Sequence, residues 1–108
     1  MILENSANKK SNIKIKYANT FFKRFKGLMG KKDIDFGLLF SNLNDSSVHT
    51  MFMRFDIDVY FIDEKKIIFE KTTLNPWKFY RPKKRAHYIL ETKKDELKLK
   101  KGDKLEFI

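Results

Sequence analysis

The clearest alternation of apolar and polar side chains lies near the beginning of the chain. In residues 12–18 ("NIKIKYA"), Ile13, Ile15 and Tyr17 alternate with lysines, a pattern typical of a strand with one buried face. Residues 1–5 ("MILEN") are apolar enough for a short edge strand, and residues 5–12 between the two are polar and rich in turn-forming types. We therefore expect the first 18 residues to form an opening hairpin.

The hydrophobic period lengthens in residues 19–32 ("NTFFKRFKGLMGKK"). Phe21, Phe25 and Leu28 have the spacing of one face of a helix. Asn19 or Thr20 can cap the first turn by accepting hydrogen bonds from backbone N–H groups. Two glycines weaken helical structure toward the end of the segment, so the pattern predicts a short helix of about two turns.

The remaining apolar segments are short and are bounded by turn-forming residues, which favours strands. We expect strands at residues 35–42, 48–53, 58–63, 66–71, 86–92 and 102–108. A turn at residues 64–66 makes the third and fourth of these strands a hairpin. Residues 72–85 contain Pro76 and Pro82 and are expected to form a loop, whereas residues 93–101 form a helical turn or run extended.

This order of elements predicts a fold of the mainly β class with one or two short helices. A chain of 108 residues fits one domain, so we expect a single domain spanning residues 1–108. Consecutive strands joined by short turns pair antiparallel. The architecture expected is therefore a small antiparallel β-sandwich or a partly open barrel.

Residues 48–63 ("VHTMFMRFDIDVYFID") are the most apolar part of the chain. Both faces of the two strands expected here are largely apolar, and such strands usually lie centrally in a sheet with both faces covered. Asp58 is then buried, and its carboxylate needs a partner because an unpaired interior charge is unfavourable by about several kcal/mol. Candidate partners are Arg24, Arg54 and backbone N–H groups. Asp56, between the strands, is interpreted as a turn residue.

Composition and charge limit the class of protein. The chain has no cysteine, which excludes disulfides and thiolate chemistry. It shows no signal-peptide pattern and no apolar run near the ~20 residues that cross a bilayer, so we expect a soluble cytoplasmic protein without a membrane partner. The net charge of +10 permits a nucleic-acid partner, but lysine is spread along the whole chain. Arginine or aromatic residues at strand spacing on one exposed face are the sharper signal for that function.

His49 and Asp58 are the polar groups most open to a functional interpretation. His49 shares its predicted strand face with two methionines, so a core histidine is favoured, with a general base or a metal ligand as the alternatives. The chain has two histidines and no pair of them at helical spacing, so no metal site and no cofactor are expected. Asp58 either fixes a turn or pairs with an arginine, or it serves as the carboxylate of a site.

Trp77 is the only tryptophan and lies in the proline-containing segment "NPWKFYRP". It can act as a lid that packs on the sheet, which is the preferred interpretation, or as a stacking platform for a sugar or a base. The basic cluster from Arg81 to Arg85 can contact phosphate, although a solvated loop is the simpler interpretation.

Several motifs together resemble the domain of unknown function 192 family, also called uncharacterised protein family 0127. They are "RFKGLMGK" at residues 24–31, "GLLF" at 37–40, "HTMFMRFDIDVYFID" at 49–63, "PW" at 76–77, "AHYILE" at 86–91 and "KGDKLEFI" at 101–108. The resemblance covers nearly the whole chain, and the third motif is its most specific part.

The resemblance implies a small, mostly β, sandwich-like domain of about this size, and it implies no established activity. The polar positions that match the family are Arg24, His49, Arg54, Asp58, Trp77 and Glu91. The turn that often follows the glutamate in the family ("LPAG") is replaced here by "TKKDE", so a function assigned to that turn does not transfer. Many bacterial relatives carry export signals, which this chain does not show.

Three functions are compatible with these observations. The first is a domain that binds a small or extended ligand, or a protein partner, in a groove beside the central strands. The second is a small hydrolase or lyase that uses His49 with Asp58 or Glu91. The third, not favoured, is a basic module for nucleic acid. The candidate ligand-binding residues are Arg24, His49, Met53, Arg54, Asp58, Trp77 and Glu91.

Overall fold

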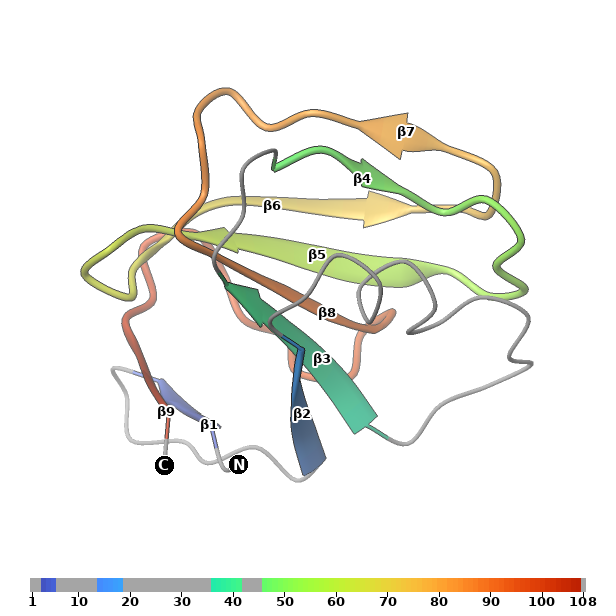
Figure 1. Ribbon diagram of the computed structural model, residues 1–108. Helices are drawn as coiled ribbons and strands as arrows, with labels where there is room; N and C mark the ends of the chain where they lie inside the picture. The colour runs from blue at the N-terminus through green and yellow to red at the C-terminus, as the bar shows by residue number, and fades with distance from the viewer. Residues whose placement is uncertain (1–2, 6–13, 19–35, 42–45, 108) are drawn as a thin grey trace.

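The computed structural model describes residues 3–5, 14–18, 36–41 and 46–107 (Figure 1). Within these ranges the chain forms nine strands. Their bounds are β1 Leu3–Asn5, β2 Lys14–Ala18, β3 Phe36–Ser41, β4 Val48–His49, β5 Ile57–Ile62, β6 Ile68–Leu74, β7 Phe79–Tyr80, β8 Tyr88–Lys93 and β9 Leu105–Phe107. No helix is present in the described ranges.

The centre of the molecule is a five-stranded sheet in the order β2-β3-β8-β5-β6. Strands β3, β8, β5 and β6 pair antiparallel with their neighbours, whereas β2 pairs parallel with β3, Ile15 lying opposite Gly37. All six residues of β5 are buried, which is expected for an interior strand covered on both faces.

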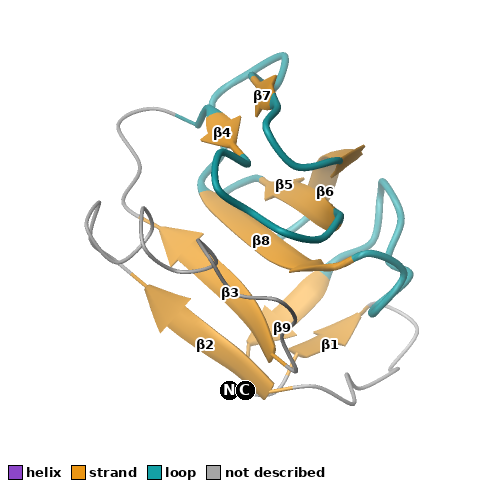
Figure 2. Ribbon diagram, turned by 90° about the vertical axis from the view of Figure 1, so that its right-hand side faces the viewer, coloured by secondary structure: helices purple, strands orange, loops and turns teal. Residues whose placement is uncertain are grey.

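Two small strand pairs cover the opposite faces of this sheet. Strands β4 and β7 pair antiparallel on one side, and β1 and β9 pair antiparallel on the other (Figure 2). We call the β4–β7 pair the ribbon. The chain leaves the central sheet after β3 to form β4 and returns to it at β5. It leaves again after β6 to form β7 and returns at β8.

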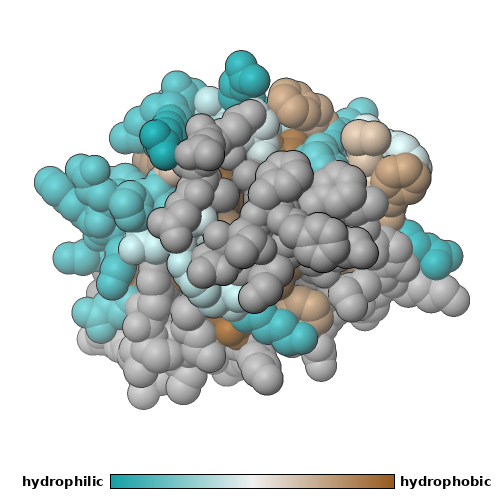
Figure 3. Space-filling view, viewed as in Figure 1, coloured by the Kyte–Doolittle hydropathy of each residue, from teal (hydrophilic) through white to brown (hydrophobic). Residues whose placement is uncertain are grey.

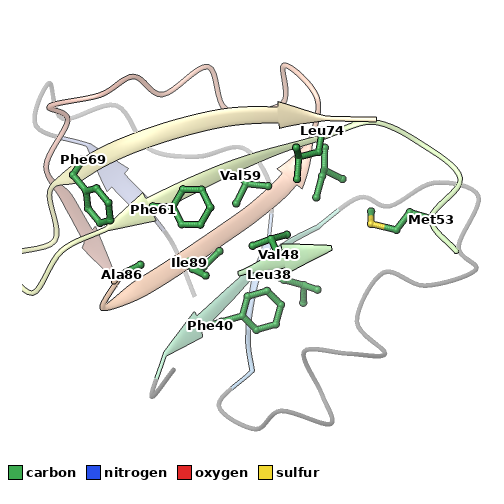
Figure 4. Packing of buried hydrophobic residues seen from close by; sticks show 11 residues of the cluster. Leu38, Phe40, Val48, Met53, Val59, Phe61, Phe69, Leu74, Ala86 and Ile89 are labelled. Carbon is green, nitrogen blue, oxygen red and sulfur yellow. The ribbon is translucent and has the colours of Figure 1, made fainter. Parts of the chain in front are cut away.

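The first core lies between the sheet and the ribbon. Val59 and Phe61 of β5 and Ile89 of β8 point toward Val48 of the ribbon, with Met53 at one end (Figure 4). Tyr80 of β7 stacks on Phe61 with ring centroids 5.7 Å apart. The Tyr80 hydroxyl donates to a carboxylate oxygen of Glu70 on β6, so the ribbon is fastened to the sheet by both apolar and polar contacts.

The second core lies on the other face of the sheet. Tyr60 and Ile62 of β5 pack with Leu90 of β8, and Leu99 and Leu105 from the C-terminal segment cover them. The Tyr60 hydroxyl is buried without a hydrogen-bond partner of ordinary geometry among the described residues. Burial raises the pKa of this phenol, and Asp58 raises it further through its negative charge.

The mainly β class is confirmed, and so are several individual elements. The strands predicted at residues 35–42, 58–63, 66–71, 86–92 and 102–108 correspond to β3, β5, β6, β8 and β9. The turn between β5 and β6 is organised by Asp63, whose carboxylate accepts from the N–H groups of Lys65 and Ile67. Pro76 and Pro82 lie outside the strands, as expected. The predicted helix at residues 19–32 lies outside the described residues.

Three predictions about strand pairing were wrong. Residues 1–18 do not form a hairpin, because β1 pairs with β9 and β2 pairs with β3. The pairing is not antiparallel throughout, because β2–β3 is parallel. Residues 72–85 are not all loop: β6 continues to Leu74, and Phe79–Tyr80 forms β7.

The strand predicted at residues 48–53 was also wrong beyond its first two residues. Only Val48–His49 is extended, and the chain then turns at Met51 and Phe52. The turn closes with a hydrogen bond from the Met53 N–H to the Thr50 carbonyl. This segment lies above the central sheet and is not one of its strands.

Candidate functional site

The ribbon has an inner and an outer face. In an antiparallel pair, residues directly opposite each other point to the same side. Val48 lies opposite Tyr80, and both belong to the first core or pack against it. His49 lies opposite Phe79, so these two side chains share the outer face. Phe79 is 65% exposed, which is unusual for a large apolar side chain in a strand.

Two tight turns lie next to the ribbon in the chain, one after β4 and one before β7. In the turn at residues 50–53, Phe52 has a φ of 64°; in the turn at residues 75–78, Trp77 has a φ of 65°. Pro76 precedes Trp77, and proline followed by a residue of positive φ is the arrangement of a type II turn. Glycine or asparagine usually occupies that third position, because a side chain there is strained.

Thr50 holds the two turns together. It is fully buried, and its carbonyl accepts from the N–H groups of Met53 and Trp77, one from each turn. Its hydroxyl donates to the Asn75 carbonyl at 2.6 Å and accepts from the Lys78 N–H at 2.7 Å. The backbone of both turns is therefore fixed from below by one residue.

The result is a pair of aromatic rings presented to solvent. Phe52 and Trp77 lie with ring centroids 4.8 Å apart at an angle of 58°, and their exposed fractions are 51% and 60%. Met51 beside them is 44% exposed. Figure 3 shows apolar side chains reaching the surface along the edge where the ribbon and its turns lie. We call Met51, Phe52, Trp77 and Phe79 the platform.

Backbone strain at the platform occurs together with exposure of the two rings. A bulky residue in the left-handed region costs on the order of 1–3 kcal/mol and persists only where the surroundings enforce it. Here two such residues lie side by side and expose their rings, whereas the expected benefit of an aromatic side chain is burial. Strain with exposed apolar area is typical of a surface that contacts something else.

The surroundings of the platform are basic. Arg54 and Lys78 are exposed and lie next to the two turns in the chain. Arg81 is exposed and follows Phe79 by two residues, and its Nε donates to the Ser47 hydroxyl at 3.2 Å. Exposed cations near exposed rings favour ligands that combine flat groups with negative charge.

The Asp58 carboxylate is buried, and its hydrogen bonds hold parts of the fold together. It is 1% exposed, as predicted, and both of its oxygens are occupied. Oδ1 accepts from the Thr73 hydroxyl at 2.6 Å, and Oδ2 accepts from the Asp95 N–H at 2.9 Å. The carboxylate thus joins β6 and the turn after β8 to β5. A backbone N–H was among the expected partners, but Thr73 was not.

The sheet keeps Asp58 apart from the other two residues of the proposed enzymatic alternative. Asp58 points into the second core, with Tyr60 and Ile62, whereas Glu91 alternates with Leu90 and points to the first-core side of the sheet. His49 lies on the outer face of the ribbon. The central sheet therefore separates Asp58 from both His49 and Glu91.

The other predicted site residues are distributed as follows. Met53 is buried in the first core, Arg54 is exposed, and Trp77 is part of the platform. Arg24 lies outside the described residues. The interpretation of Trp77 as a lid packed on the sheet was wrong, because most of its surface is exposed. The described residues contain no group of three or more histidine, aspartate or glutamate side chains placed to hold a metal ion.

The exposure of Met51, Phe52 and Phe79 is not predicted from the sequence. The pattern predicts a strand at Met51 and Phe52, because an apolar run without glycine does not indicate a turn. It predicts a loop at Phe79. A signal was available in residues 77–81, where Trp77, Phe79 and Arg81 alternate at strand spacing.

Comparison with known proteins identifies the family. The family described as "DUF192: Uncharacterized ACR, COG1430" matches residues 2–107. This chain belongs to the DUF192 family. A UPF0127 protein of Pyrococcus furiosus is 38% identical over 98% of the chain and 97% of its own length. A UPF0127 protein of Pyrococcus horikoshii is 37% identical over 99% of the chain and 98% of its own length. The names of these DUF192 relatives state no activity.

Two crystal structures share the DUF192 fold described here. A putative transcription regulator from Sinorhizobium meliloti superposes with a TM-score of 0.81 at 21% identity, covering 97% of this chain and 89% of that one. A protein of unknown function from Novosphingobium aromaticivorans superposes with a TM-score of 0.82 at 16% identity, covering 98% of this chain and 82% of that one. At these identities the likeness shows the fold alone. Within its described residues, this DUF192 chain forms no helix long and apolar enough to span a membrane.

Proposed function

We propose that this protein is a binding domain and that its ligand docks on the platform. The ligand is extended and carries flat rings, which stack on Phe52, Trp77 and Phe79. This replaces the groove beside the central strands, expected from the sequence, with the outer face of the ribbon. Arg54 and Trp77 remain from the residues expected to bind ligand, and His49 lies beside Phe79 on the same face.

One observation carries the proposal: two aromatic residues with positive φ expose their rings side by side. Glycine at these positions relieves the strain, so the presence of large rings there supports a use for them. The rings are also preorganised, because Thr50 fixes both turns. A preorganised contact loses little conformational freedom when the ligand binds.

A ligand screen tests the proposal, since a ligand that binds only the native state raises the melting temperature. The panel consists of oligosaccharides, nucleotides, oligonucleotides and aromatic peptides. Trp77 is the only tryptophan, so a ligand that stacks on the platform also changes the intrinsic tryptophan fluorescence. We expect at least one class to produce both effects, and the rise in melting temperature to be lost in Trp77→Ala.

Tyr17→Ala is the matched control. Tyr17 is also an exposed aromatic residue, but it lies two residues from Ile15 on the face of β2 turned toward the second core. Its removal should leave the ligand-induced shift unchanged. A panel in which no class changes the fluorescence of Trp77, or in which Tyr17→Ala and Trp77→Ala behave alike, contradicts the proposal.

A further inference from the structure

The segments around the platform carry positive charges and no negative ones. The two segments that build the ribbon and its turns, residues 46–55 and 75–87, contain six basic residues and no acidic residue. Their net charge is therefore +6, and it is carried by less than a quarter of the chain. The six basic residues are Arg54, Lys78, Arg81, Lys83, Lys84 and Arg85, and all are exposed.

Some of these cations are held in place by local contacts. The ammonium group of Lys84 lies 4.6 Å from the centroid of the Phe69 ring. The backbone N–H of Lys83 donates to Glu70 at 2.9 Å, and Glu70 also accepts from Tyr80. The basic segment that follows β7 is thus anchored to β6, which keeps its positive side chains near the ribbon.

Two rings and a cation follow one another in and beside β7. Trp77 in the turn and Phe79 in β7 are followed by Arg81 at the same two-residue spacing. This is the arrangement that distinguishes an interface for nucleic acid from a generally basic surface: rings that stack on bases, next to cations that neutralise phosphates.

We infer that the ligand of the platform is single-stranded nucleic acid. The inference rests on the proposed function and names its ligand class. Phe52, Trp77 and Phe79 stack on unpaired bases, and Arg54, Lys78 and Arg81 contact the sugar-phosphate backbone. Stacking needs the flat face of a base, which a duplex keeps covered, so the single strand binds more tightly than the duplex. Every base has such a face, so binding depends little on sequence.

The test measures fluorescence anisotropy of labelled 15-nucleotide single strands, one DNA and one RNA of uniform pyrimidine sequence, with the full chain at several salt concentrations. The same strands as duplexes and inorganic polyphosphate serve as competitors. We expect tighter binding to the single strands than to the duplexes, quenching of Trp77 fluorescence, and weaker binding as the salt concentration rises.

Variants separate stacking from charge. Trp77→Ala should weaken binding of the single strands by roughly 10- to 100-fold with little change in salt dependence, whereas Trp77→Phe should retain most of the affinity. Arg81→Ala should reduce the slope of log affinity against log salt by about 0.7, the value for one phosphate contact to a single strand. Lys101→Ala, which removes an exposed cation from the turn before β9, should change neither quantity. Circular dichroism confirms that each variant is folded.

The outcomes distinguish this inference from the proposed function. If the oligonucleotides bind no better than polyphosphate and Trp77→Ala binds as well as wild type, the contact is only electrostatic and the inference is overturned. If oligonucleotides do not bind but another ligand quenches Trp77, the binding domain stands and its ligand class is wrong. A third outcome is that the platform joins two copies of the chain. A dimer that Trp77→Ala dissociates and that oligonucleotides do not affect contradicts both the proposed function and this inference.

Discussion

At the scale of single residues, the most informative feature is the left-handed backbone of Phe52 and Trp77. Neither residue can relax, because Thr50 fixes the carbonyl and N–H groups of both turns. The cost of the conformation and the function of the ring can be measured separately, because glycine removes both the strain and the ring whereas alanine removes only the ring.

We predict that Trp77→Gly is more stable than Trp77→Ala by about 1 kcal/mol. The physical reason is that alanine retains the Cβ that makes a positive φ unfavourable. Urea denaturation of both variants measures the difference, and both variants should bind ligand equally poorly. Equal stabilities of the two variants indicate that the φ of 65° at Trp77 is not strained.

Tyr60 permits a second prediction at this scale. Burial raises the pKa of its phenol, and the charges of Asp58, Asp95 and Asp103 raise it further. A pKa that is higher in the folded than in the unfolded state stabilises the fold below the unfolded value of about 10, and that contribution is lost as pH rises above it. The phenol ionises less readily in the folded state than in the unfolded chain, so alkali favours unfolding.

In Tyr60→Phe, the free energy of unfolding should therefore decrease less at alkaline pH than in the wild type. We expect the wild type to lose up to about 1 kcal/mol more than Tyr60→Phe between pH 8 and pH 11. At pH 8 the two proteins should be almost equally stable, because the buried hydroxyl has no partner of ordinary geometry to lose. Urea denaturation at the two pH values decides: parallel losses in both proteins contradict the assignment to Tyr60.

At residue scale, sequence reasoning succeeded where burial alone decides the outcome. Asp58 was correctly expected to be buried, because the apolar residues around it left no exposed face. Its partner Thr73 could not be expected, since that contact depends on the register of β5 against β6. The turn at Met51–Phe52 could not be expected either, because its cause is the hydroxyl and carbonyl of Thr50 bonding to a segment some 25 residues away in the chain.

At the scale of elements, the parallel pairing of β2 with β3 is the feature that departs most from the sequence pattern. A parallel pair needs a connection of about a dozen residues or more, and residues 19–35 provide that length between the two strands. The alternation in residues 12–18 indicates a half-buried strand but does not specify its partner. Strand identity was therefore predictable at β2, whereas its neighbour was not.

Close contact between β2 and β3 depends on Gly37. A Cβ at this position lies 2.9 Å from Cδ1 of Ile15 and 3.2 Å from Cγ2 of Thr92. We predict that Gly37→Ala destabilises the protein by about 1–3 kcal/mol, because Ile15 and Thr92 are buried and have little room to move. Thermal and urea denaturation measure the effect.

The variant Ile15→Val supplies the control for this contact, because it removes the methyl group that the new Cβ meets. The double variant should be destabilised by less than the sum of the losses measured for the two single variants. Full additivity contradicts the explanation by a clash with Ile15 and leaves backbone effects in β3 as the cause.

At the scale of the whole molecule, one sheet separates two cores, and every apolar residue of β5 contributes to one or the other. The mainly β class and the hairpin of β5 with β6 were predictable from periodicity and turn residues. The ribbon and the β1–β9 pair were not, because β4 and β7 have two residues each and β1 pairs with a strand from the other end of the chain. Long-range pairing of short strands leaves no periodic signal.

The shared sheet predicts that the two cores unfold together. Leu105→Ala removes a fully buried side chain from the second core and should cost about 2–4 kcal/mol. Trp77 lies on the opposite side of the sheet, above the first core. Urea unfolding followed by Trp77 fluorescence and by far-ultraviolet circular dichroism should shift to the same lower midpoint. A fluorescence midpoint that stays at the wild-type value contradicts a single cooperative unit.

The ribbon lies outside the central sheet, and this has a consequence for sequence variation among homologues. Neither β4 nor β7 is a member of the five-stranded sheet. Sequence changes in the turns of the ribbon therefore need not disturb the strand register of that sheet. The sheet can stay constant while the turns of the ribbon are exchanged. Transplanting these turns from one homologue onto another is then a direct way to transfer its ligand specificity.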